Sequence, residues 1–587
     1  MDILVWLYGG TYSVHPTADA QWIYLHTSAY DSNGKPTNYS ARKPQIPAGY
    51  EVKGITTTQN GETTTLYRVR QEISSSTALN DKGGNNETED IKVTEDVTIA
   101  NDATTAKYVE VADGTVTIPE GKSLEVTNGL DVSGDAKVVV EPGSTLAVRE
   151  GGVISSTPDN IVIEADENGS ASFLLSPDVI VNTTPNLTVK MTAKQIGSAP
   201  NVAGGVDYYW HRFAMPVEHI TSLPRTPNKL TYIKYWDYSI GAEGNWADVT
   251  SLEELEPFVG YCMTLSEARQ DVEYTFQGNL SGNQNSTLDF TKKGFNFFGN
   301  SYTGYISLDK LVDQITAMGD DKIEGSVWVW APGQTYDGVG LQELREHPEH
   351  FIGEEYKTEI APMQTFILLQ KSAENISTEI NYANAIWGNP RYSSITGTPA
   401  PVRRSVEAGN DTYMRVVITA ADGKSDAVRF LESENYSDAF DNGYDVSKYM
   451  NNGTINVYST VEGTNYGTVA TDQLEGKTIS VETNDALTYT LSFKNVTGEP
   501  YAIKDEVTGK VIAIEEGQTY EFAAQPNSTV EGRFRIVAVN EVVTSVEATE
   551  MKSDVKGIYT VLGQYVGEDF NSLPAGVYVV NGVKIIK

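Results

Sequence analysis

Short runs of alternating apolar and polar residues, separated by turn residues, recur along almost the whole chain. Alternation with a period of two is typical of strands that bury one face. Two Asn-Gly pairs, Asn60-Gly61 and Asn581-Gly582, each lie between two such runs, which is the strongest short-range signal of a β-hairpin. Residues 308–318 instead carry apolar residues at helical spacing and predict a surface helix. The pattern therefore predicts a nearly all-β protein.

The hydrophobic pattern repeats within residues 91–195. Each unit consists of a short strand, a glycine turn and a second short strand. Five positions of one unit recur 22 residues later, pairing Val116 with Val138, Ile118 with Val140, Gly121 with Gly143, Leu124 with Leu146, and Val126 with Val148. Such units can stack as a β-solenoid, in which each coil buries its apolar row against the next and glycine permits the corner. A twisted sandwich is the alternative for the same pattern.

Shifts in composition divide the chain into six parts. Residues 73–90 lose the hydrophobic pattern and are rich in Ser, Gly, Asn and Asp, which predicts a flexible linker. The parts are an N-terminal β-module (1–72), that linker (73–90), a β-solenoid-like repeat segment (91–195), an aromatic-rich β-domain (200–400), a β-sandwich (411–540) and a small C-terminal β-unit (543–587). The expected fold class is all-β, with tandem β-sandwich domains beside the repeat segment and the C-terminal unit.

The charge of the chain restricts its partners. The formal net charge is −36 and the isoelectric point is about 4.5, which argues against a nucleic-acid backbone as a partner. Cys262 is the single cysteine, so no internal disulfide can form, and we expect a buried structural thiol. No apolar run approaches the roughly 18 residues that a membrane helix needs, so we expect no transmembrane segment.

The sequence contains no convincing catalytic motif. A Gly-x-Ser-x-Gly elbow and a phosphate-binding glycine loop are both absent, so we expect no enzyme, no catalytic, cofactor-binding or metal-binding residues, and no cofactor. His347 and His350 are three residues apart with a proline between them, and the favoured interpretation is a solvated helix end rather than a metal site. Weak calcium binding near Asp166 or Asp320-Asp321 stays open, although neither has the ligand spacing of an EF-hand loop.

Four tryptophans could form a ligand platform. Trp236, Trp246, Trp328 and Trp330 lie in the aromatic-rich β-domain, and indole rings stack well on sugars. Trp328 and Trp330 are two residues apart and so share one face of a strand. The favoured interpretation is that alternating strands bury these side chains as core.

The C-terminal residues resemble the C-terminal sorting domain of the type IX secretion system of Bacteroidetes, in its short gut-bacterial variant. The resemblance covers roughly the last 45 residues and lacks the Pro-Asn-Pro element that often opens longer members. The residues that carry it are Gly557, Tyr559, Gly563, Gln564, Leu573, Pro574, Gly576, Tyr578, Lys584 and Lys587. The resemblance implies an export address that the type IX machinery recognises, and it implies nothing about chemistry.

Two stretches of the body also resemble secreted Bacteroidetes proteins. The order Trp210-His211, Gly260-Tyr261, Phe276-Gln277-Gly278 and Gly299-Asn300-Ser301-Tyr302 is similar to a β-domain of such proteins, where proline is common in place of Ser301. Residues 440–448 resemble a loop that often lies just ahead of the sorting domain.

We therefore expect a non-catalytic secreted or cell-surface protein, adhesin-like or structural, exported through its C-terminal sorting domain (543–587). Its partners would be the type IX machinery and a surface glycan or a host protein. The first ten residues lack the basic region of a signal peptide, so the leader that such cargo needs is not present in this sequence. A virion fibre protein and a carbohydrate-binding or glycan-active surface protein are the alternatives.

Overall fold

The structure is a computed structural model of the chain. It describes residues 11–12, 23–26, 39–42, 50–59, 62–71, 76–149, 153–156, 160–166, 169–177, 179–181, 186–200, 205–218, 220, 230–240, 244–251, 255–280, 285–331, 335–351, 358–382, 386–387, 411–451, 454–539, 557–560, 565–567, 569, 572–573, 577–580 and 583–586. Nearly all described elements are strands, so the all-β prediction is confirmed. None of the helices in these ranges is long and apolar enough to cross a membrane.

The predicted N-terminal hairpin is present. Strands β4 (Tyr50–Gln59) and β5 (Glu62–Gln71) pair antiparallel with Gln59 opposite Glu62, whereas Asn60 and Gly61 themselves lie outside the described residues. Strand β1 (Thr11–Tyr12) adds to β5, and β2 (Ile23–His26) pairs with β3 (Tyr39–Arg42).

The described residues between 76 and 200 form a β-solenoid, and the 22-residue repeat corresponds to one of its coils. Strands β9 (Thr115–Ile118) and β11 (Lys137–Val140) pair in parallel with Val116 opposite Val138, as the repeat predicts. Strands β10 (Ser123–Val132) and β12 (Thr145–Val148) pair in parallel with Leu124 opposite Leu146. The predicted register is therefore confirmed to the residue, and the twisted sandwich is excluded for this segment.

Each coil has three sides that stack on the sides of the neighbouring coils. In the first three coils one long strand forms two sides; these strands are β6 (Asn85–Val93), β8 (Ala103–Val111) and β10. The first halves of these strands continue into β12 and β16 (Ser172–Leu175), which complete the first side. The second halves continue into β13 (Val153–Ser156) and β17 (Ile180–Val181), which complete the second side. The third side comprises β7 (Val97–Thr98), β9, β11, β14 (Ile161–Asp166) and β18 (Asn186–Pro200). Inward-facing Val, Leu and Ile residues fill the interior, since every coil contributes the same apolar row.

The prediction of a flexible linker at residues 73–90 is wrong for its described part. Helix η1 (Ser76–Gly84) and β6 form the start of the solenoid, and Leu79 is fully buried in its core. The polar residues that suggested a linker close the first coil instead. The Asn80 side chain donates to the carbonyl of Thr98 and accepts from the backbone N–H of Ala100, both at 2.8 Å, and Asn86 donates to the carbonyl of Ala78. These side chains occupy backbone groups that would otherwise be unpaired at the end of the stack.

Strand β18 joins the solenoid to the next domain. One edge of β18 pairs in parallel with β14, and the other pairs antiparallel with β25 (Gln270–Leu280), where Val189 lies opposite Phe276. The hydrophobic core runs without interruption from Leu79 in the first coil to Phe276 beyond this strand. The boundary predicted at residues 195–200 therefore lies within a shared sheet.

The aromatic domain (described residues 206–387) is built from small antiparallel sheets around two helices. Helix α1 (Leu308–Thr316) confirms the predicted helix and buries Leu311, Val312 and Ile315, and α2 (Leu341–Glu346) is followed by η3 (Pro348–Phe351). The sheet orders are β20-β24-β22-β23, β27-β32-β29-β30, β26-β33 and β31-β28-β34. Their strands, with β19 and β21 at the solenoid junction, are β19 (Val206–Tyr209), β20 (His211–Ala214), β21 (Val217–Glu218), β22 (Thr231–Asp237), β23 (Asn245–Asp248), β24 (Gly260–Leu265), β26 (Ser286–Phe290), β27 (Gly294–Gly299), β28 (Tyr305–Ser307), β29 (Ile323–Ala331), β30 (Thr335–Gly340), β31 (Glu359–Ile360), β32 (Thr365–Gln370), β33 (Ile376–Ile380) and β34 (Ile386–Trp387).

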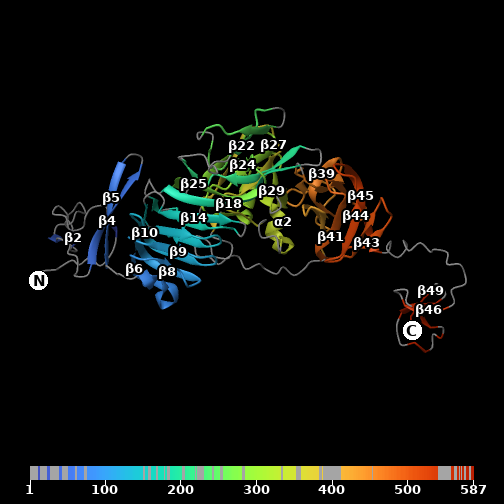
Figure 1. Cartoon of the computed structure of the whole chain (residues 1–587), viewed down its shortest axis with the longest axis horizontal. Coiled ribbons are helices and arrows are strands. Elements are labelled where there is room, and N and C mark those ends of the chain that lie inside the picture. The colour runs from blue at the N-terminus through green and yellow to red at the C-terminus, as the bar shows by residue number, and fades with distance from the viewer. Residues whose placement is uncertain are drawn as a thin grey trace, which may run out of the picture.

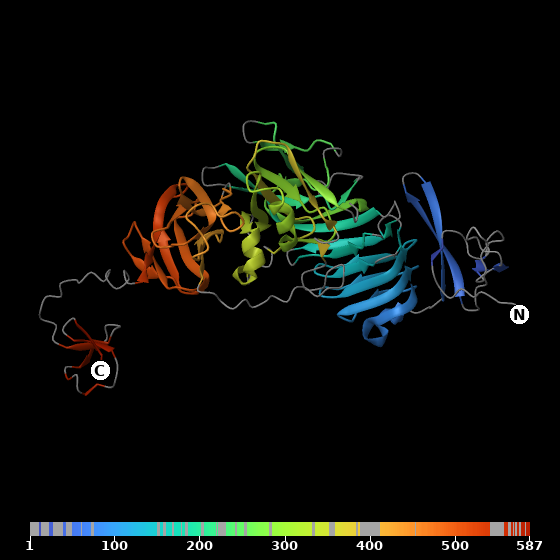
Figure 2. The same cartoon turned by 180° about the vertical axis from the view of Figure 1, so that it is seen from behind.

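The sandwich (residues 412–538) has its own core of aliphatic and aromatic side chains. Its strand path is β43-β42-β45-β40-β38-β39-β36-β35-β41-β44, with β37 paired to β39. The strands are β35 (Thr412–Ala420), β36 (Ser425–Glu432), β37 (Val446–Ser447), β38 (Asn456–Val461), β39 (Thr464–Thr471), β40 (Thr478–Glu482), β41 (Thr488–Thr497), β42 (Tyr501–Asp505), β43 (Val511–Ala513), β44 (Thr519–Ala523) and β45 (Thr529–Ala538). Figures 1 and 2 show the solenoid, the aromatic domain and the sandwich following one another along the long axis of the molecule.

The C-terminal unit contains a four-stranded antiparallel sheet in the order β47-β46-β48-β49. These strands are β46 (Ile558–Thr560), β47 (Tyr565–Gly567), β48 (Val577–Val580) and β49 (Val583–Ile586). Val580 lies opposite Val583, so the hairpin predicted at Asn581-Gly582 is confirmed.

Candidate functional site: the aromatic cluster and the interdomain contact

Aromatic side chains from five strands of the aromatic domain pack into one cluster. Trp236 on β22 and Trp246 on β23 lie edge to face, with 5.3 Å between ring centroids, and both contact Phe297 on β27. Phe297 contacts Tyr336 on β30, which in turn contacts Trp330 on β29 at 5.0 Å. Edge-to-face pairs of this kind contribute about 1 kcal/mol each beyond the area that they bury. The sequence-predicted tryptophans are thus brought together.

Strand β29 is buried on both faces. Val327 and Val329 pack in the core that includes α1 and α2, whereas Trp328 packs in the aromatic cluster on the opposite face. Trp330 contacts the same cluster, as expected for residues two apart on a strand. Because Trp328 is only 1% exposed, its ring cannot serve as a sugar platform. Trp236, Trp246 and Trp330 are half-buried.

The guanidinium group of Arg212 on β20 lies against this cluster. Its central carbon is 4.1 Å from the ring centroid of Trp246 and 5.5 Å from that of Trp330, which is cation–π geometry. Its Nε and Nη1 atoms are buried and make no hydrogen bond to any described residue. Burial, helped by the charge of Arg212, lowers the pKa of His211 to about 4. The predicted buried thiol is present, because Cys262 is 2% exposed and its burial raises the pKa to about 11.

The aromatic cluster continues into the sandwich. Tyr449 of the sandwich contacts Phe295, Phe297 and Tyr336, with centroid distances between 5.1 and 6.1 Å. The indole N–H of Trp328 donates to the carbonyl of Ser447 at 3.0 Å. The cluster therefore forms part of the joint between two domains.

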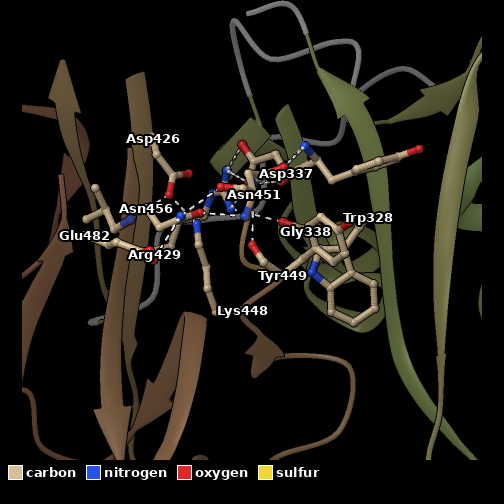
Figure 3. Close-up of polar contacts among 12 residues, drawn as sticks. Trp328, Asp337, Gly338, Asp426, Arg429, Lys448, Tyr449, Asn451, Asn456 and Glu482 are labelled. Atoms are coloured by element: carbon tan, nitrogen blue, oxygen red, sulfur yellow. Dashed lines mark hydrogen bonds and ion pairs between the residues drawn. The ribbon is translucent and has the colours of Figure 1, made fainter. Parts of the chain in front are cut away.

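A polar network surrounds this joint. Arg429 on β36 is 1% exposed, and its guanidinium group contacts the Asp337 carboxylate at 3.3 Å and donates to the carbonyl of Gly338 at 3.1 Å. Asn451 accepts from the backbone N–H of Tyr336 at 2.7 Å and donates to the carbonyl of the same residue at 3.1 Å. Figure 3 shows Arg429 and Asn451 reaching from the sandwich toward Asp337 and Gly338 of the aromatic domain.

Residues 436–451, here named the docking loop, supply most of these contacts. Gly443 has a φ of +87°, and its carbonyl accepts hydrogen bonds from the backbone N–H groups of Gln342 and Glu343 at the start of α2, both at 3.1 Å. A side chain at position 443 would place its Cβ only 2.8 Å from Cβ of Gln342. Asn442 donates to Asp320 and accepts from the N–H of Gly325. The stretch that resembles a loop ahead of the sorting domain is therefore an interdomain contact in the structure.

Two buried carboxyl groups lie at the docking loop, Glu324 of the aromatic domain and Asp445 of the loop itself. Glu324 is 2% exposed and accepts hydrogen bonds from the N–H and the Oγ of Ser447, yet burial raises the pKa of its carboxyl group. Burial likewise raises the pKa of Asp445 to about 7, against the hydrogen bonds that it accepts from the N–H groups of Asp441 and Ala470. The joint therefore favours the neutral forms of these acids.

The residues predicted as a sorting signal fall partly on the small C-terminal sheet. Tyr559 lies on β46, Tyr578 on β48 and Lys584 on β49, where Lys584 is opposite Val579. Tyr578 is buried, and Gly557 and Leu573 lie outside the strands. Gly563, Gln564, Pro574, Gly576 and Lys587 lie outside the described residues.

Sequence reasoning missed Arg212 and the role of the docking loop. The only available signal for Arg212 was its place next to Trp210-His211 in an aromatic strand, and this does not indicate a buried cation. The loop had a signal of a different kind, since its Asn, Asp and Gly residues indicate a turn but not the surface that the turn contacts.

Comparisons with protein-family models, with curated protein sequences and with solved structures find no match to this chain, so its function must be argued from the residues and geometry above.

Proposed function

We propose that this chain is a non-catalytic secreted or cell-surface protein, adhesin-like or structural, and that the described residues between 76 and 539 act as a stiff elongated body. The observation that carries this proposal is the continuity of packing through three successive parts. Strand β18 belongs to both the solenoid and the aromatic domain, and the docking loop fixes the sandwich to the aromatic domain. A stiff body holds its far end at a set distance from its point of attachment, as a spacer or adhesin must.

The solenoid junction is held by more than β18. The last coil would end in an unpaired strand edge, but the N–H of Phe173 on β16 donates to the carbonyl of Thr303 at 2.8 Å, and the Thr303 hydroxyl donates back to the carbonyl of Phe173. Tyr382 donates to the carbonyl of Leu175 at 2.8 Å. Interdomain contacts within a chain usually permit relative motion, whereas hydrogen-bonded strand edges over a shared core restrict it.

Three buried acidic residues, Asp505, Glu324 and Asp426, have structural partners, which supports a structural role for them. Asp505 pairs with Arg533 at 3.1 Å and accepts from the Tyr520 hydroxyl at 2.9 Å. Glu324 accepts a hydrogen bond from the N–H of Ser447. Asp426 forms an ion pair with Lys448 and accepts a hydrogen bond from the N–H of Val457. Perturbed acids of a catalytic site normally face a cleft that admits substrate.

The export part of the proposal rests on the resemblance of the C-terminal unit. In the native bacterium, a chain without residues 543–587 should fold normally but remain in the periplasm, because the sandwich core closes before that unit begins. Surface labelling and cell fractionation measure the outcome, with the full chain as the control. Normal surface display of the shortened chain contradicts the proposal. A stable trimer that resists mild detergent would instead support a virion fibre.

Arg212 favours a second candidate function, recognition of an acidic glycan. A guanidinium group whose Nε and Nη1 make no hydrogen bond to a described residue, and which lies near two half-buried indoles, has the chemistry that a sugar carboxylate and its apolar face require. Binding of the chain to an array of uronic-acid polysaccharides should be lost on Trp246→Ala and retained on Tyr208→Ala, which changes an exposed aromatic residue. A flat response of the unmodified chain across the array removes this candidate.

A further inference from the structure

Two histidines and a glutamate meet where α2 passes into η3. Ligand atoms of His347, Glu349 and His350 all lie within 4.8 Å of one another. The interpretation as a solvated helix end is wrong for His350, which is only 9% exposed and whose ring lies between two others, whereas the His347 side chain is 20% exposed. The His347 ring is stacked on one side at 5.0 Å, and the Tyr413 ring of the sandwich is stacked on the other at 3.8 Å.

A fully buried carboxylate orients His350. Oε1 of Glu343 lies 3.3 Å from Nδ1 of His350, and the side chain of Glu343 is 1% exposed. A carboxylate can only accept a hydrogen bond when it is ionised, and a neutral His350 ring beside it would then carry its proton on Nδ1 and leave the lone pair of Nε2 free. This is the usual arrangement of a metal-binding histidine, in which a carboxylate holds the nitrogen that does not bind the metal.

A carboxylate oxygen of one candidate ligand has no partner. Oε2 of Glu349 is buried and makes no hydrogen bond within the described residues. A buried carboxylate oxygen without a donor or a cation is costly, and a cation bound by Glu349 would remove that cost. This observation is independent of the spacing of the three ligand atoms.

We propose that His347, Glu349 and His350 bind one divalent transition-metal ion, with zinc as the best match, and that Glu343 positions His350. Mixed imidazole and carboxylate ligands suit zinc, and three protein ligands leave one position for water. Atoms that bind one zinc ion tetrahedrally lie about 3.4 Å apart, so small rotations of the three side chains would bring the ligand atoms from the present 4.8 Å limit to that spacing.

The position of the site gives the metal a structural role. The carbonyl of His350 accepts hydrogen bonds from the hydroxyl of Tyr413 at 3.3 Å and from the Asn495 side chain at 3.1 Å, and both donors belong to the sandwich. A metal that fixes the His350 ring would also fix the surface on which the sandwich packs. The ion would therefore stabilise the joint through contacts other than those of Arg429.

The test uses the full chain, freed of metal by a chelator and dialysed against zinc at about 1 µM free concentration. The unmodified chain should bind one zinc ion, and its melting temperature should rise on binding. His347→Ala and Glu349→Gln should each weaken zinc affinity at least tenfold and abolish that rise. His219→Ala, which changes a histidine elsewhere in the chain, is the matched control and should bind as the unmodified chain does.

Cobalt provides a second readout that does not depend on stability. Co²⁺ in the site should give the strong visible absorption of a four-coordinate ion, and His347→Ala should lose it. Circular dichroism checks that each variant is folded. If His347→Ala does not fold, Glu349→Gln decides the test, because Glu349 is the most exposed of the three ligands. The proposal is overturned if the unmodified chain binds no zinc, or if both variants bind it with unchanged affinity.

Discussion

At the scale of single residues, the buried carboxyl groups make the stability of the joint depend on pH. Burial raises the pKa of Glu324 and, to about 7, that of Asp445. A carboxyl whose pKa is raised on folding stabilises the folded state when it is protonated. Its contribution is complete below the unfolded pKa and is lost as the pH rises through the folded pKa.

Glu324→Gln should remove one of these contributions without losing its hydrogen bonds. The amide oxygen can accept from the N–H of Ser447, and the amide nitrogen can donate to Oγ of Ser447. The difference in melting temperature, variant minus unmodified chain, should therefore become more positive as the pH rises from about 5 to about 8. Thermal unfolding at several pH values measures this, and a difference that stays constant contradicts the argument.

Arg429 should contribute more to stability than any exposed ion pair of the sandwich. Arg429→Met leaves Asp337 without its buried partner and should lower the free energy of unfolding by about 3 kcal/mol. Arg535→Met breaks a shorter ion pair, with Glu506 at 2.7 Å, but both side chains are 36% exposed, so its effect should stay below about 1 kcal/mol. Urea unfolding of both variants checks the order, and equal effects would show that the buried pair is not important.

At the scale of elements, the corners of the solenoid contain glycines with positive φ, and the space around these glycines differs from one corner to another. Gly114 and Gly134 precede β9 and β11 and have φ values of +74° and +64°. A Cβ at Gly114 would lie 2.4 Å from the backbone carbon of Glu95 in the previous coil, whereas a Cβ at Gly134 would meet nothing within 4 Å. The two positions share the backbone conformation and differ in the space around it.

Gly114→Ala should therefore destabilise the solenoid more than Gly134→Ala. The alanine at 134 adds only the strain of a left-handed conformation, about 1 kcal/mol. At 114 the neighbouring coil must also move, and we expect a total of about 3 kcal/mol or more. Melting temperatures of the two variants test the contrast, and an equal loss at both positions would mean that stacking of the coils does not restrict this corner.

At the scale of the whole molecule, the docking loop decides whether the body behaves as one unit. Gly443 and Gly463 both have positive φ, +87° and +83°. Gly443 contacts α2, but a Cβ at Gly463 would meet nothing within 4 Å. Substitution at Gly463 therefore adds backbone strain alone, whereas substitution at Gly443 adds the same strain and also disturbs the interdomain contact.

Gly443→Ala should loosen the joint, and Gly463→Ala should not. For the first variant we expect a larger radius of gyration in small-angle X-ray scattering and a separate melting transition of the sandwich in calorimetry. For the second we expect the scattering of the unmodified chain with a small loss of melting temperature. Unchanged scattering and a single transition for Gly443→Ala would show that the docking loop does not fix the sandwich.

The sequence by itself determined the local features of this protein. Alternation identified the strands, the 22-residue repeat set the register of Val116 on Val138, and Asn-Gly pairs placed two hairpins. These features follow from periodicity and turn chemistry, which depend only on neighbouring residues. The four tryptophans could be named from the sequence, but they lie in two different sheets, so their meeting did not follow from neighbouring residues.

Only the tertiary structure decided what the polar residues do. Asn80 caps the first coil. Arg429 pairs with Asp337, which is 92 residues away in the sequence, and Glu324 accepts a hydrogen bond from Ser447, which is 123 residues away. Contacts with the sandwich also bury Trp328, whose indole N–H donates to the carbonyl of Ser447, and His350, whose ring stacks on Tyr413. A polar side chain satisfies its hydrogen bonds equally well in water, so its sequence neighbours do not reveal which distant group replaces that water on folding.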